Sequence, residues 1–587
     1  MSLKPAGSHF NFQPLSLPLK GENWRPLEYA LARWVLAHGG DAALARLAAE
    51  ASLADAEGQS ALRIEDARQR EQLAQMPLVG EGMHSAAPFI LDGDLFYLRR
   101  NFAHELAVAR RLAKRLEQAA PPLAGGQPVD VESLFPEPQD PRVAAQLAAV
   151  KAALGQSLFV LSGGPGTGKT TTVLRMLMAQ WQAQGGGLRI RLAAPTGKAA
   201  QRISESLRAA RAEDFPPQWQ AALAAVQNSQ ASTVHRLLGS RGMRGGWTQH
   251  SDEPLPVDVL VIDEASMLDL AMLRAVLDAL PDRARLILVG DANQLDSVGT
   301  GSVLRDIVDV LDSKHLVQLH HSFRADRALL PLIEAVRQGE SDAFQTALVA
   351  AGEQAQQQPV PSRAVLHTLL ESWAGTISRQ WQQDGSLERI DAANHGEIAR
   401  QLQSLRRQQL LCALRDGEYG AAGANALIEE SLRRQQAGFN GWGGSTLWYP
   451  GRRIIITRND ETSGLWNGDV GLCLADEKGL LRVWFETASG EVRSVDIGAL
   501  PPHQGAFAVT VHKAQGSEYG EVAVLLPPQP DHPLLTRQWF YTAISRAKQR
   551  LHVWGSDVAI AHAIRTSVER IGGLRGRLRQ MLTNAVE

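Results

Sequence analysis

The sequence predicts an α/β protein with several domains, on three observations. Its 587 residues are enough for about three or four domains of ordinary size. Short apolar runs alternate with helix-like segments, at residues 158–161 (LFVL), 188–194 (LRIRLAA), 257–262 (VDVLVI) and 285–289 (RLILV). These runs are continuous rather than alternating, which is typical of parallel strands buried on both faces. The first run leads through a glycine-rich loop into a helical pattern.

Composition excludes several classes of protein. The apolar fraction of 44% and the charged fraction of 21% are ordinary for a globular protein. Sixty basic and 62 acidic residues give a net charge of −2, so no overall positive field indicates a nucleic-acid or membrane partner. Cys412 and Cys473 lie far apart, which argues against a disulfide framework or a zinc ribbon. With no long apolar run and no signal peptide, we expect a soluble cytoplasmic protein that binds anions only locally.

The remaining segments differ in pattern along the chain. Residues 24–118 have mainly helical spacing, with an extended-looking stretch, PFILDGDLFYLRR, between the helical parts. Residues 119–128 are rich in Pro and Gly and predict a linker. The Gln-rich residues 353–361 predict a surface loop. A β-rich, Gly-punctuated segment at 448–500 precedes a second set of short strands, so the sequence predicts two α/β units with a small β insertion.

A phosphate-binding loop is the strongest local signal. Residues 163–170 (GGPGTGKT) fit the G-x-x-x-x-G-K-[ST] pattern between a buried strand and a helix. Backbone N–H groups of such a loop surround phosphate oxygens at a helix N-terminus. Lys169 then places a charge between the β- and γ-phosphates, and the Thr170 hydroxyl is a ligand for Mg²⁺. A glycine-rich turn without a nucleotide is the alternative interpretation.

Asp263 and Glu264 end the apolar run at 257–262. A carboxylate at the end of a strand beside a phosphate loop is suited to hold Mg²⁺, which we assign to Asp263. Glu264 is then placed to accept a proton from the attacking water. The alternative is that the pair caps the N-terminus of the helix beginning near Ser266.

Further motifs identify the type of nucleotide-dependent protein. In order, they are APTGKAAQRISE (194–205), STVHRLLG (232–239), VIDEASM (261–267), LVGDANQLDSVGTG (288–301), HHSFR (320–324), FAVTVHKAQGSEYG (507–520) and FYTAISRAKQRL (540–551). They resemble the motifs of superfamily 1 DNA helicases, and most closely those of the RecD branch, the alpha subunits of exodeoxyribonuclease V. QLLCALRDGEYGAAGAN (409–425), RRIIITRND with LWNGDVG (452–471) and PFILDGDLFYLRR also resemble RecD sequences. The resemblance therefore covers nearly the whole chain.

The resemblance implies ATP and Mg²⁺ as cofactors and a set of site residues. Gln146 matches the position that recognises adenine, although a lone helical Gln is more often solvated. Gln294 matches a sensor of the γ-phosphate or its attacking water; a turn amide is the alternative. Arg324 and Arg546 match two arginines presented to the transferring phosphoryl group, and Glu518 and Gly516 match groups near the ribose and γ-phosphate. The full set comprises the catalytic residues Lys169, Thr170, Asp263, Glu264, Gln294, Arg324 and Arg546, the nucleotide contacts Gln146, Gly163, Gly164, Pro165, Gly166, Thr167, Gly168, Lys169, Thr170, Thr171, Gly516 and Glu518, and the metal ligands Thr170 and Asp263.

The resemblance also implies a groove that tracks a single strand of DNA. Its matching positions are Thr196, Lys198, Thr233, His235, Thr510, His512 and Lys513. Short hydroxyls, backbone N–H groups and a few cations hold phosphates without reading bases, as a motor that passes any sequence requires. Either His could instead be a core residue. Near-neutral net charge predicts few neutralised phosphates and a shallow salt dependence.

The resemblance implies the following domains, within an α/β fold. Residues 1–125 form a mainly helical N-terminal domain that docks on a partner. Residues 126–325 form the first RecA-like motor domain, with a small hairpin insertion near 240–256. The second RecA-like motor domain takes residues 326–459 and 505–587, around an SH3-like insertion at 460–504. Trp247 lies in the polar, Gly-rich hairpin segment, which we interpret as the element placed at a duplex junction.

The expected function is that of an ATP-dependent 5′→3′ DNA helicase subunit in a RecBCD-type helicase–nuclease that resects double-strand breaks. The implied partners are single-stranded DNA, duplex ends, and RecB-like and RecC-like subunits, with no membrane. Outside the ATPase set no carboxylate spacing predicts a nuclease site, so we expect that activity in a partner. The alternatives are a free-standing RecD-like helicase, a non-catalytic scaffold subunit and a transporter-type ATPase. The short segment before the phosphate loop argues against the free-standing helicase. The intact ATPase residues argue against the scaffold, and the lack of membrane segments argues against the transporter-type ATPase.

Overall fold

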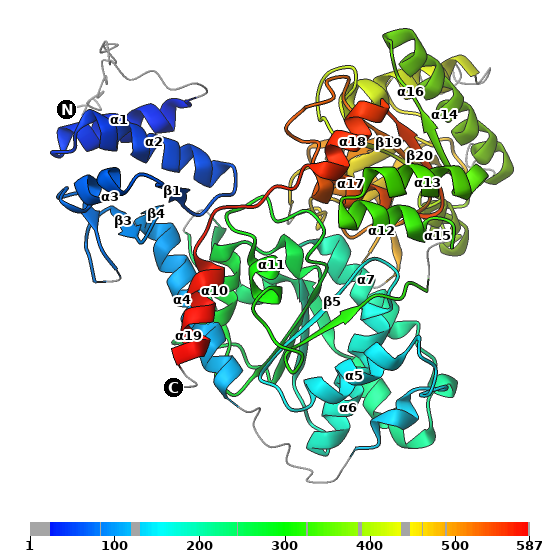
Figure 1. The fold of residues 1–587 in the computed structure, drawn as a ribbon. Helices are drawn as coiled ribbons and strands as arrows, with labels where there is room; N and C mark the ends of the chain where they lie inside the picture. Colours follow the sequence, from blue (N-terminus) through cyan, green and yellow to red (C-terminus); the bar gives the residue numbers. More distant parts are fainter. Residues whose placement is uncertain are drawn as a thin grey trace, which may run out of the picture. The chain divides into compact units, whose positions relative to one another are not determined.

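The computed structural model describes residues 24–82, 84–118, 129–242, 245–323, 327–384, 390–435, 447–460, 462–487 and 490–584 (Figure 1). The chain forms two compact units. The first runs to Glu105 and includes Gly299–Gly301 and Arg570–Gly573. The second comprises Leu106–Val298, Ser302–Glu569 and the stretch from Leu574 onward. The predicted linker at 119–128 lies outside the described residues.

The first unit combines helices with a small sheet. Its helices are α1 (Pro26–Ala37), α2 (Ala42–Ala56), α3 (Ala67–Ala74) and the start of α4 (Arg99–Glu117). The four strands lie in the order β1 (Leu62–Arg63), β4 (Leu95–Leu98), β3 (Phe89–Asp92) and β2 (Val79–Gly80). Gly93, at φ 61°, makes the tight turn between β3 and β4, where a left-handed backbone favours glycine. The extended-looking stretch in the sequence is this hairpin, within the predicted helical region.

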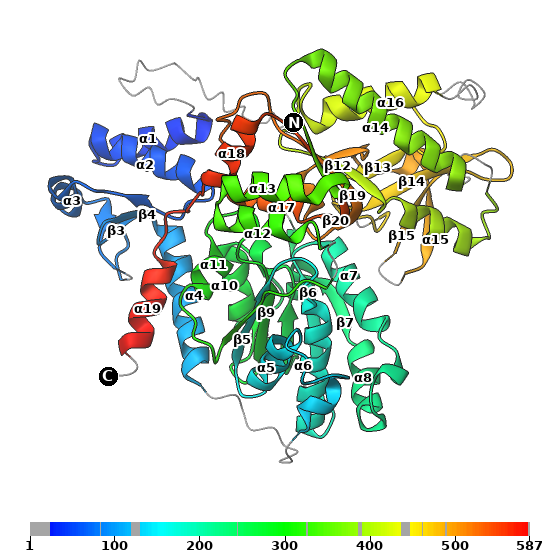
Figure 2. The ribbon, with the colours of Figure 1, turned by 45° about the vertical axis from the view of Figure 1, so that its right-hand side comes forward.

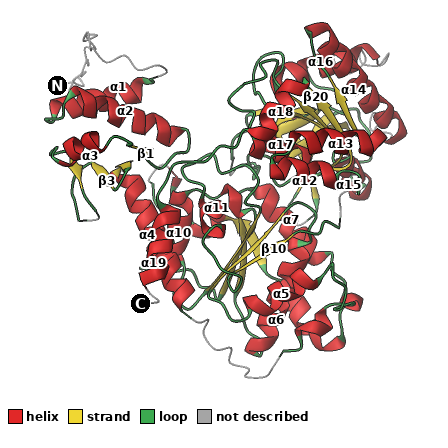
Figure 3. Ribbon diagram, viewed as in Figure 1, coloured by secondary structure: helices red, strands yellow, loops and turns green. Residues whose placement is uncertain are grey.

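The second unit contains a first sheet of six parallel strands (Figure 3). Their order is β10 (Leu316–Leu319), β5 (Leu158–Gly163), β9 (Arg285–Gly290), β8 (Val259–Ile262), β6 (Ile190–Ala194) and β7 (Gln230–Thr233). The accompanying helices are α5 (Ala144–Ala153), α6 (Lys169–Gln184), α7 (Gly197–Arg208), α8 (Gln220–Gln227), α9 (Val234–Leu238), α10 (Leu270–Ala279) and α11 (Val303–Val308). Strands β5, β8 and β9 are fully buried, which explains their continuous apolarity. Because the strands are parallel, the loops after β5, β8 and β9 meet at one edge.

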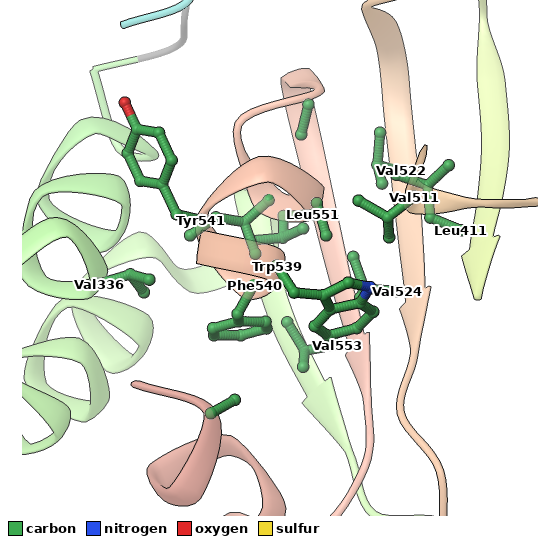
Figure 4. Packing of buried hydrophobic residues seen from close by; sticks show 14 of the residues in the cluster. Val336, Leu411, Val511, Val522, Val524, Trp539, Phe540, Tyr541, Leu551 and Val553 are labelled. Carbon is green, nitrogen blue, oxygen red and sulfur yellow. The ribbon is translucent and has the colours of Figure 1, made fainter. Parts of the chain in front are cut away.

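A second parallel sheet follows, with the strand order β11 (Ala355–Gln358), β20 (Ala547–Trp554), β19 (Tyr519–Leu525), β12 (Gln408–Cys412) and β18 (Ala508–Thr510). Its helices are α12 (Leu330–Gln338), α13 (Ser341–Ala351), α14 (Arg363–Asp384), α16 (Ala421–Gln435), α17 (Arg537–Ile544) and α18 (Asp557–Arg565), whereas α15 (His395–Ser404) packs on an antiparallel sheet. Apolar side chains such as Trp539, Phe540 and Val553 pack between the sheet and its helices (Figure 4). The expectation of a surface loop at the Gln-rich segment is wrong, because residues 355–358 pair with β20 as the edge strand β11.

An antiparallel sheet of five strands interrupts the second parallel sheet. Its order is β16 (Val492–Asp496), β15 (Leu481–Glu486), β14 (Val470–Ala475), β13 (Arg453–Ile456) and β17 (His503–Gly505). Figure 2 shows β13, β14 and β15 beside α15 and below α14. Two parallel sheets, this insertion and a helix-containing N-terminal region confirm the predicted α/β class. An SH3-like classification and the domain bounds stay predictions.

Helix α4, which precedes the first parallel sheet in the chain, and the C-terminal helix α19 (Leu574–Asn584) contribute to the core of that sheet. Val108 and Leu112 of α4 and Leu574 and Leu578 of α19 are buried together with residues of α10 and α11. The sequence analysis assigns residues 574–584 to the second motor domain, which they follow in the chain. The buried side chains of α19 instead pack in the core of the first parallel sheet. Among the described residues, no helix is long and apolar enough to cross a membrane.

Candidate active site

The phosphate-binding loop has the geometry that its glycines allow. It connects β5 to α6, and Gly166 and Gly168 have φ values of 76° and 82°, which other residues rarely adopt. The Lys169 ammonium donates to the carbonyl oxygens of Gly163 at 2.6 Å and Gly164 at 3.0 Å. The Thr167 hydroxyl donates to the Gly164 carbonyl at 2.9 Å and closes the loop on itself. The charge of Lys169 is thus held inside the loop.

Gln146 on α5 is tied to this loop. Its Nε2 donates to the Thr167 carbonyl at 3.1 Å, and the side chain is buried. A Cβ at position 168 would lie 2.4 Å from Gln146 Nε2, so the close approach requires the glycine. The interpretation of Gln146 as a solvated surface residue is therefore wrong. Its contact with adenine stays a prediction.

Asp263 and Glu264 follow β8 at the same edge of the sheet. Burial, and then the charge of Glu264, raise the pKa of Asp263 to about 6, partly offset by Lys169. Glu264 is the one non-glycine among the described residues with a positive φ, 52°, and strain of this kind is found mostly at functional sites. Its amide donates to Asp263 Oδ1 at 2.9 Å. The helix-capping alternative is not what the structure shows, since Asp269 caps α10 and Glu264 makes no side-chain capping bond.

These residues line a cavity to which both parallel-sheet domains contribute side chains. It is lined by Pro165, Gly166, Thr167, Gly168, Lys169, Thr170, Ala199, Arg202, Ile203, Ser206, Asp263, Glu264, Gln294, Gly516, Glu518 and Arg546. Arg546, between α17 and β20, is 2% exposed, and Gln294, after β9, is 3% exposed. Among the described residues, Arg546 Nη2 and Gln294 Oε1 have no hydrogen-bond partner. Buried polar atoms of this kind are suited to a polar ligand. Arg324 lies outside the described residues.

Glu518 lies in an ion-pair cluster that the sequence did not predict. Its Oε2 is 3.1 Å from Arg202 Nη2 and 3.2 Å from Lys548 Nζ. Arg202, on α7, also donates to the Gly516 carbonyl, where φ is 71°. The contact between Glu518 and the ribose stays a prediction. Arg202 stands four residues after Lys198 in the same motif, and this helical spacing was the available signal.

Asp291 and Tyr541 are also functional candidates that the sequence reasoning missed. Asp291 follows β9 in the motif that contains Gln294, and Tyr541 lies on α17. The Tyr541 hydroxyl donates to Asp291 Oδ2 at 2.9 Å. The two residues are 250 positions apart in the chain, so only the fold shows their pairing.

The candidate DNA residues lie at the starts of helices and at the end of one strand. Thr196 and Thr233 cap α7 and α9 by accepting from the amides of Ala199 and Arg236 at 3.2 Å. Lys198 is half-buried, and burial followed by the charges of Arg202 and Arg406 lowers its pKa to about 8. His235 is exposed, with its ring centroid 5.6 Å from that of Trp247, so its interpretation as a core residue is wrong.

The second group of candidate DNA residues follows β18. Thr510 ends that strand, and His512 and Lys513 are in the short helical turn Val511–Ala514. Burial, and then Arg415, lower the pKa of Lys513.

A cavity of about 230 Å³ lies between α7, β7 and the antiparallel sheet, and it is lined by Thr233, Arg236 and Trp466. The assignment of all seven residues to DNA stays a prediction.

Comparisons with known proteins identify the family. The AAA domain family model matches residues 146–300, and the UvrD-like helicase C-terminal domain model matches residues 505–554. The chain is 37% identical over 516 residues to the RecBCD enzyme subunit RecD of Mycolicibacterium smegmatis, covering 86% of each chain. It is 32% identical over 491 residues to the same-named subunit of Haemophilus influenzae, covering 76% of this chain and 73% of that one. The chain belongs to the RecD family.

Membership of the RecD family makes the chain an ATP-dependent superfamily 1 DNA helicase of recombinational repair, which confirms the predicted resemblance and enzyme class. The ATP-dependent RecD2 DNA helicase of Deinococcus radiodurans is 31% identical, but the match covers 69% of this chain and only 48% of that protein. A crystal structure of a Bacteroides Pif1 helicase in complex with ADP-AlF3 and ssDNA is similar at 16% identity, with a TM-score of 0.36, covering 70% of this chain and 91% of that one.

Proposed function

We propose that this chain is the 5′→3′ helicase subunit of a RecBCD-type helicase–nuclease that resects double-strand breaks, and that it hydrolyses Mg·ATP between its two parallel-sheet domains. The observation that carries the proposal is the shared cavity. Lys169, Asp263, Glu264 and Gln294 reach it from the first domain, and Arg546 reaches it from the second. A cleft with contributions from both sides lets hydrolysis change how the domains pack.

The residues of the cavity fit an ATPase mechanism. Lys169 is placed to neutralise charge between the β- and γ-phosphates after release from the loop carbonyls. Glu264 is placed to accept the proton of the attacking water, with Gln294 orienting that water. Arg546, whose Nη2 has no partner among the described residues, is placed to stabilise the charge on the transferring phosphoryl group. The motif match assigns the same role to Arg324.

The donors of Thr170 and Asp263 fit Mg²⁺. A hydroxyl and a carboxylate are the hard oxygen ligands that this ion prefers, and both residues line the cavity. Asp263 is buried beside a second carboxylate, which favours binding of a cation. When bound, Mg²⁺ would neutralise charge between the β- and γ-phosphate oxygens. The chain's part is to hold the ion on Thr170 and Asp263.

We further propose that Thr196, Lys198, Thr233, His235, Thr510, His512 and Lys513 contact a single strand of DNA. The helix starts at Thr196 and Thr233 support this, because backbone N–H groups there favour anions. RecB-like and RecC-like partners and the 5′→3′ direction are proposed from family membership. On the same ground, we propose that the nuclease activity belongs to a partner. A cytoplasmic location agrees with two cysteines that are buried and unpaired.

The proposal is tested by ATP hydrolysis of the purified chain with and without single-stranded DNA, and again after co-expression with RecB-like and RecC-like chains. We expect stimulation by DNA, loss of hydrolysis in Lys169→Gln and Glu264→Gln, and unwinding of duplexes with a 5′ single-stranded tail. Stimulation only in the complex would place the active motor in the assembly. No hydrolysis in either setting would favour the scaffold alternative, and unwinding only from 3′ tails would refute the proposed direction.

A further inference from the structure

One end of the Gln294 amide is hydrogen-bonded, and the other end is buried without a partner among the described residues, in a side chain that lines the cavity. Gln294 Nε2 donates to Asp291 Oδ2 at 3.2 Å. Gln294 Oε1 is buried without a hydrogen-bond partner among the described residues, in a side chain that lines the cavity with Lys169 and Glu264. An unpaired buried acceptor costs free energy unless a donor reaches it. A donor from the cavity side, such as a water O–H, satisfies this atom.

Asp291 binds the NH₂ end of the Gln294 amide and leaves its oxygen free of that contact. Its carboxylate is 1% exposed and, when ionised, only accepts hydrogen bonds. Oδ1 accepts from the Asn293 amide at 3.0 Å, and Oδ2 accepts from Gln294 Nε2 and from the Tyr541 hydroxyl. Because an acceptor binds the NH₂ end of the amide, the oxygen of Gln294 is left for the cavity.

Tyr541 comes from the other domain. Figure 4 shows its ring turned away from Trp539 and Phe540, with the hydroxyl at the far end of the side chain. That hydroxyl lies against the phosphate-binding loop, since a Cβ at position 164 would be 3.0 Å from it. Burial, and then the charge of Asp291, raise the pKa of Tyr541 well above its ordinary value. The phenol therefore keeps its proton and donates a hydrogen bond to Asp291.

The same helix connects this hydrogen bond to Arg546. The hydroxyl of Thr542, beside Tyr541 on α17, accepts from the Leu295 amide at 2.9 Å, which fixes the loop of Gln294 a second time. The Thr542 carbonyl accepts from Arg546 Nε at 3.0 Å. Helix α17 and the residues that follow it therefore link the Tyr541 hydroxyl, the loop of Gln294 and the Arg546 guanidinium.

We propose that Tyr541 is a positioning residue for hydrolysis: by donating across the cleft to Asp291, it turns the oxygen of Gln294 toward the water that attacks ATP. The inference rests on the proposed function, because it assigns a role within that ATPase site. Orientation of Gln294 then depends on closure of the two domains. A purely structural role would predict a less stable protein with an unaltered chemical step.

The test compares the wild-type chain, with its partners if they are needed for activity, with Tyr541→Phe, which removes only the hydroxyl. We expect kcat for DNA-stimulated hydrolysis to fall about tenfold or more, the effect of one hydrogen bond on a rate, while KM for ATP stays within about twofold. Asp291→Asn should behave similarly. Tyr449→Phe is the matched control, since Tyr449 is equally buried but packs in a different cluster of the second domain and should leave kcat unchanged.

A double-mutant cycle decides whether Tyr541 acts through Gln294. In a Gln294→Ala background, Tyr541→Phe should reduce the remaining kcat no further. Wild-type kcat in Tyr541→Phe, or a full additional loss in the Gln294→Ala background, would overturn the inference. If Tyr541→Phe has a lower melting temperature than the wild type, single-turnover hydrolysis is measured below that temperature. The rates of wild type, Tyr541→Phe and Asp291→Asn are then compared while all three proteins are folded. An inactive wild type, alone and with partners, would instead refute the proposed function itself.

Discussion

Lys198 is the residue whose charge is most sensitive to its surroundings among the candidate DNA contacts. It lies beside Arg202 and Arg406, and Asp469 and Glu486 offset part of their repulsion. Its pKa of about 8 means that the ammonium is charged at pH 7 and largely neutral at pH 9. Since a phosphate binds the charged form, DNA binding above pH 8 must be accompanied by uptake of a proton.

We therefore expect the affinity for single-stranded DNA to fall about tenfold between pH 7 and pH 9, because about nine in ten Lys198 side chains are neutral one pH unit above their pKa. Fluorescence anisotropy of a labelled oligonucleotide measures this. Lys198→Arg stays charged over the whole range and should remove most of the dependence. An identical decline in both proteins would show that Lys198 does not contact a phosphate.

At the scale of residues, the sequence could predict which side chains lie together where they belong to short contiguous motifs, while their roles stay predictions. The phosphate loop, the Asp263–Glu264 pair and Gln294 all lie in one cavity, as the motifs suggested. Tyr541 with Asp291, and Arg202 with Glu518, could not be predicted, because the residues of each pair are at least 250 positions apart. A side chain's partner across a domain cleft depends on tertiary packing, which a local pattern does not contain.

Among the elements, the segment after α9 has little regular secondary structure in its described residues. Ser240 and Trp247 form an isolated antiparallel bridge, and the Thr248 hydroxyl donates to the Gly239 carbonyl at 3.0 Å. The base of the predicted hairpin is therefore paired, and Trp247 packs partly against the core of the first domain. Residues 243 and 244, in its middle, lie outside the described residues.

Shortening this element tests its proposed place at the duplex junction. Replacing residues 241–246 with a two-residue Asn-Gly turn keeps the paired residues Ser240 and Trp247 and should preserve the fold. We expect DNA-stimulated ATP hydrolysis to stay near the wild-type rate and strand separation to fall severalfold, in parallel ATPase and unwinding assays. Equal loss of both activities would indicate a structural role.

A strand could be predicted where its burial requires a run of apolar residues in the sequence. A strand without such a run could not be predicted. The apolar runs of the sequence predicted strands β5, β8 and β9, which are buried in the structure. The edge strand β11 was not predicted, because its Gln side chains show neither alternation nor apolarity, and its pairing with β20 supplies the hydrogen bonds. An edge position can accept such a polar sequence.

For the whole molecule, charge is the property that governs DNA binding. The net charge of −2 provides no long-range attraction, so in our proposal DNA binding depends on cations among the proposed contact residues. The proposed contacts include only two lysines, Lys198 and Lys513, with neighbouring arginines such as Arg202 and Arg406 engaged in ion pairs with carboxylates. Backbone N–H groups and hydroxyls supply the remaining contacts.

From this we expect a shallow salt dependence for the isolated chain. About two to four neutralised phosphates correspond to a slope of log K against log salt of about −1.5 to −3 for single-stranded DNA. Titrations between 50 and 300 mM salt measure the slope. A value near −6, as from eight or more ionic contacts, would show that DNA follows a different and more basic surface.

The packing of α19 on the first domain decides where probes of motion should be attached. The chain leaves the second domain after α18 and ends on the first, so a dye or fusion protein at the C-terminus follows the first domain. A donor–acceptor pair with one dye there and the other on α6 would stay at constant distance while the motor steps. Pairing a C-terminal dye with one on α14 would report the cycle. Because both native thiols are buried, with their pKa values raised to about 12, engineered surface cysteines would take the labels without prior removal of Cys412 and Cys473.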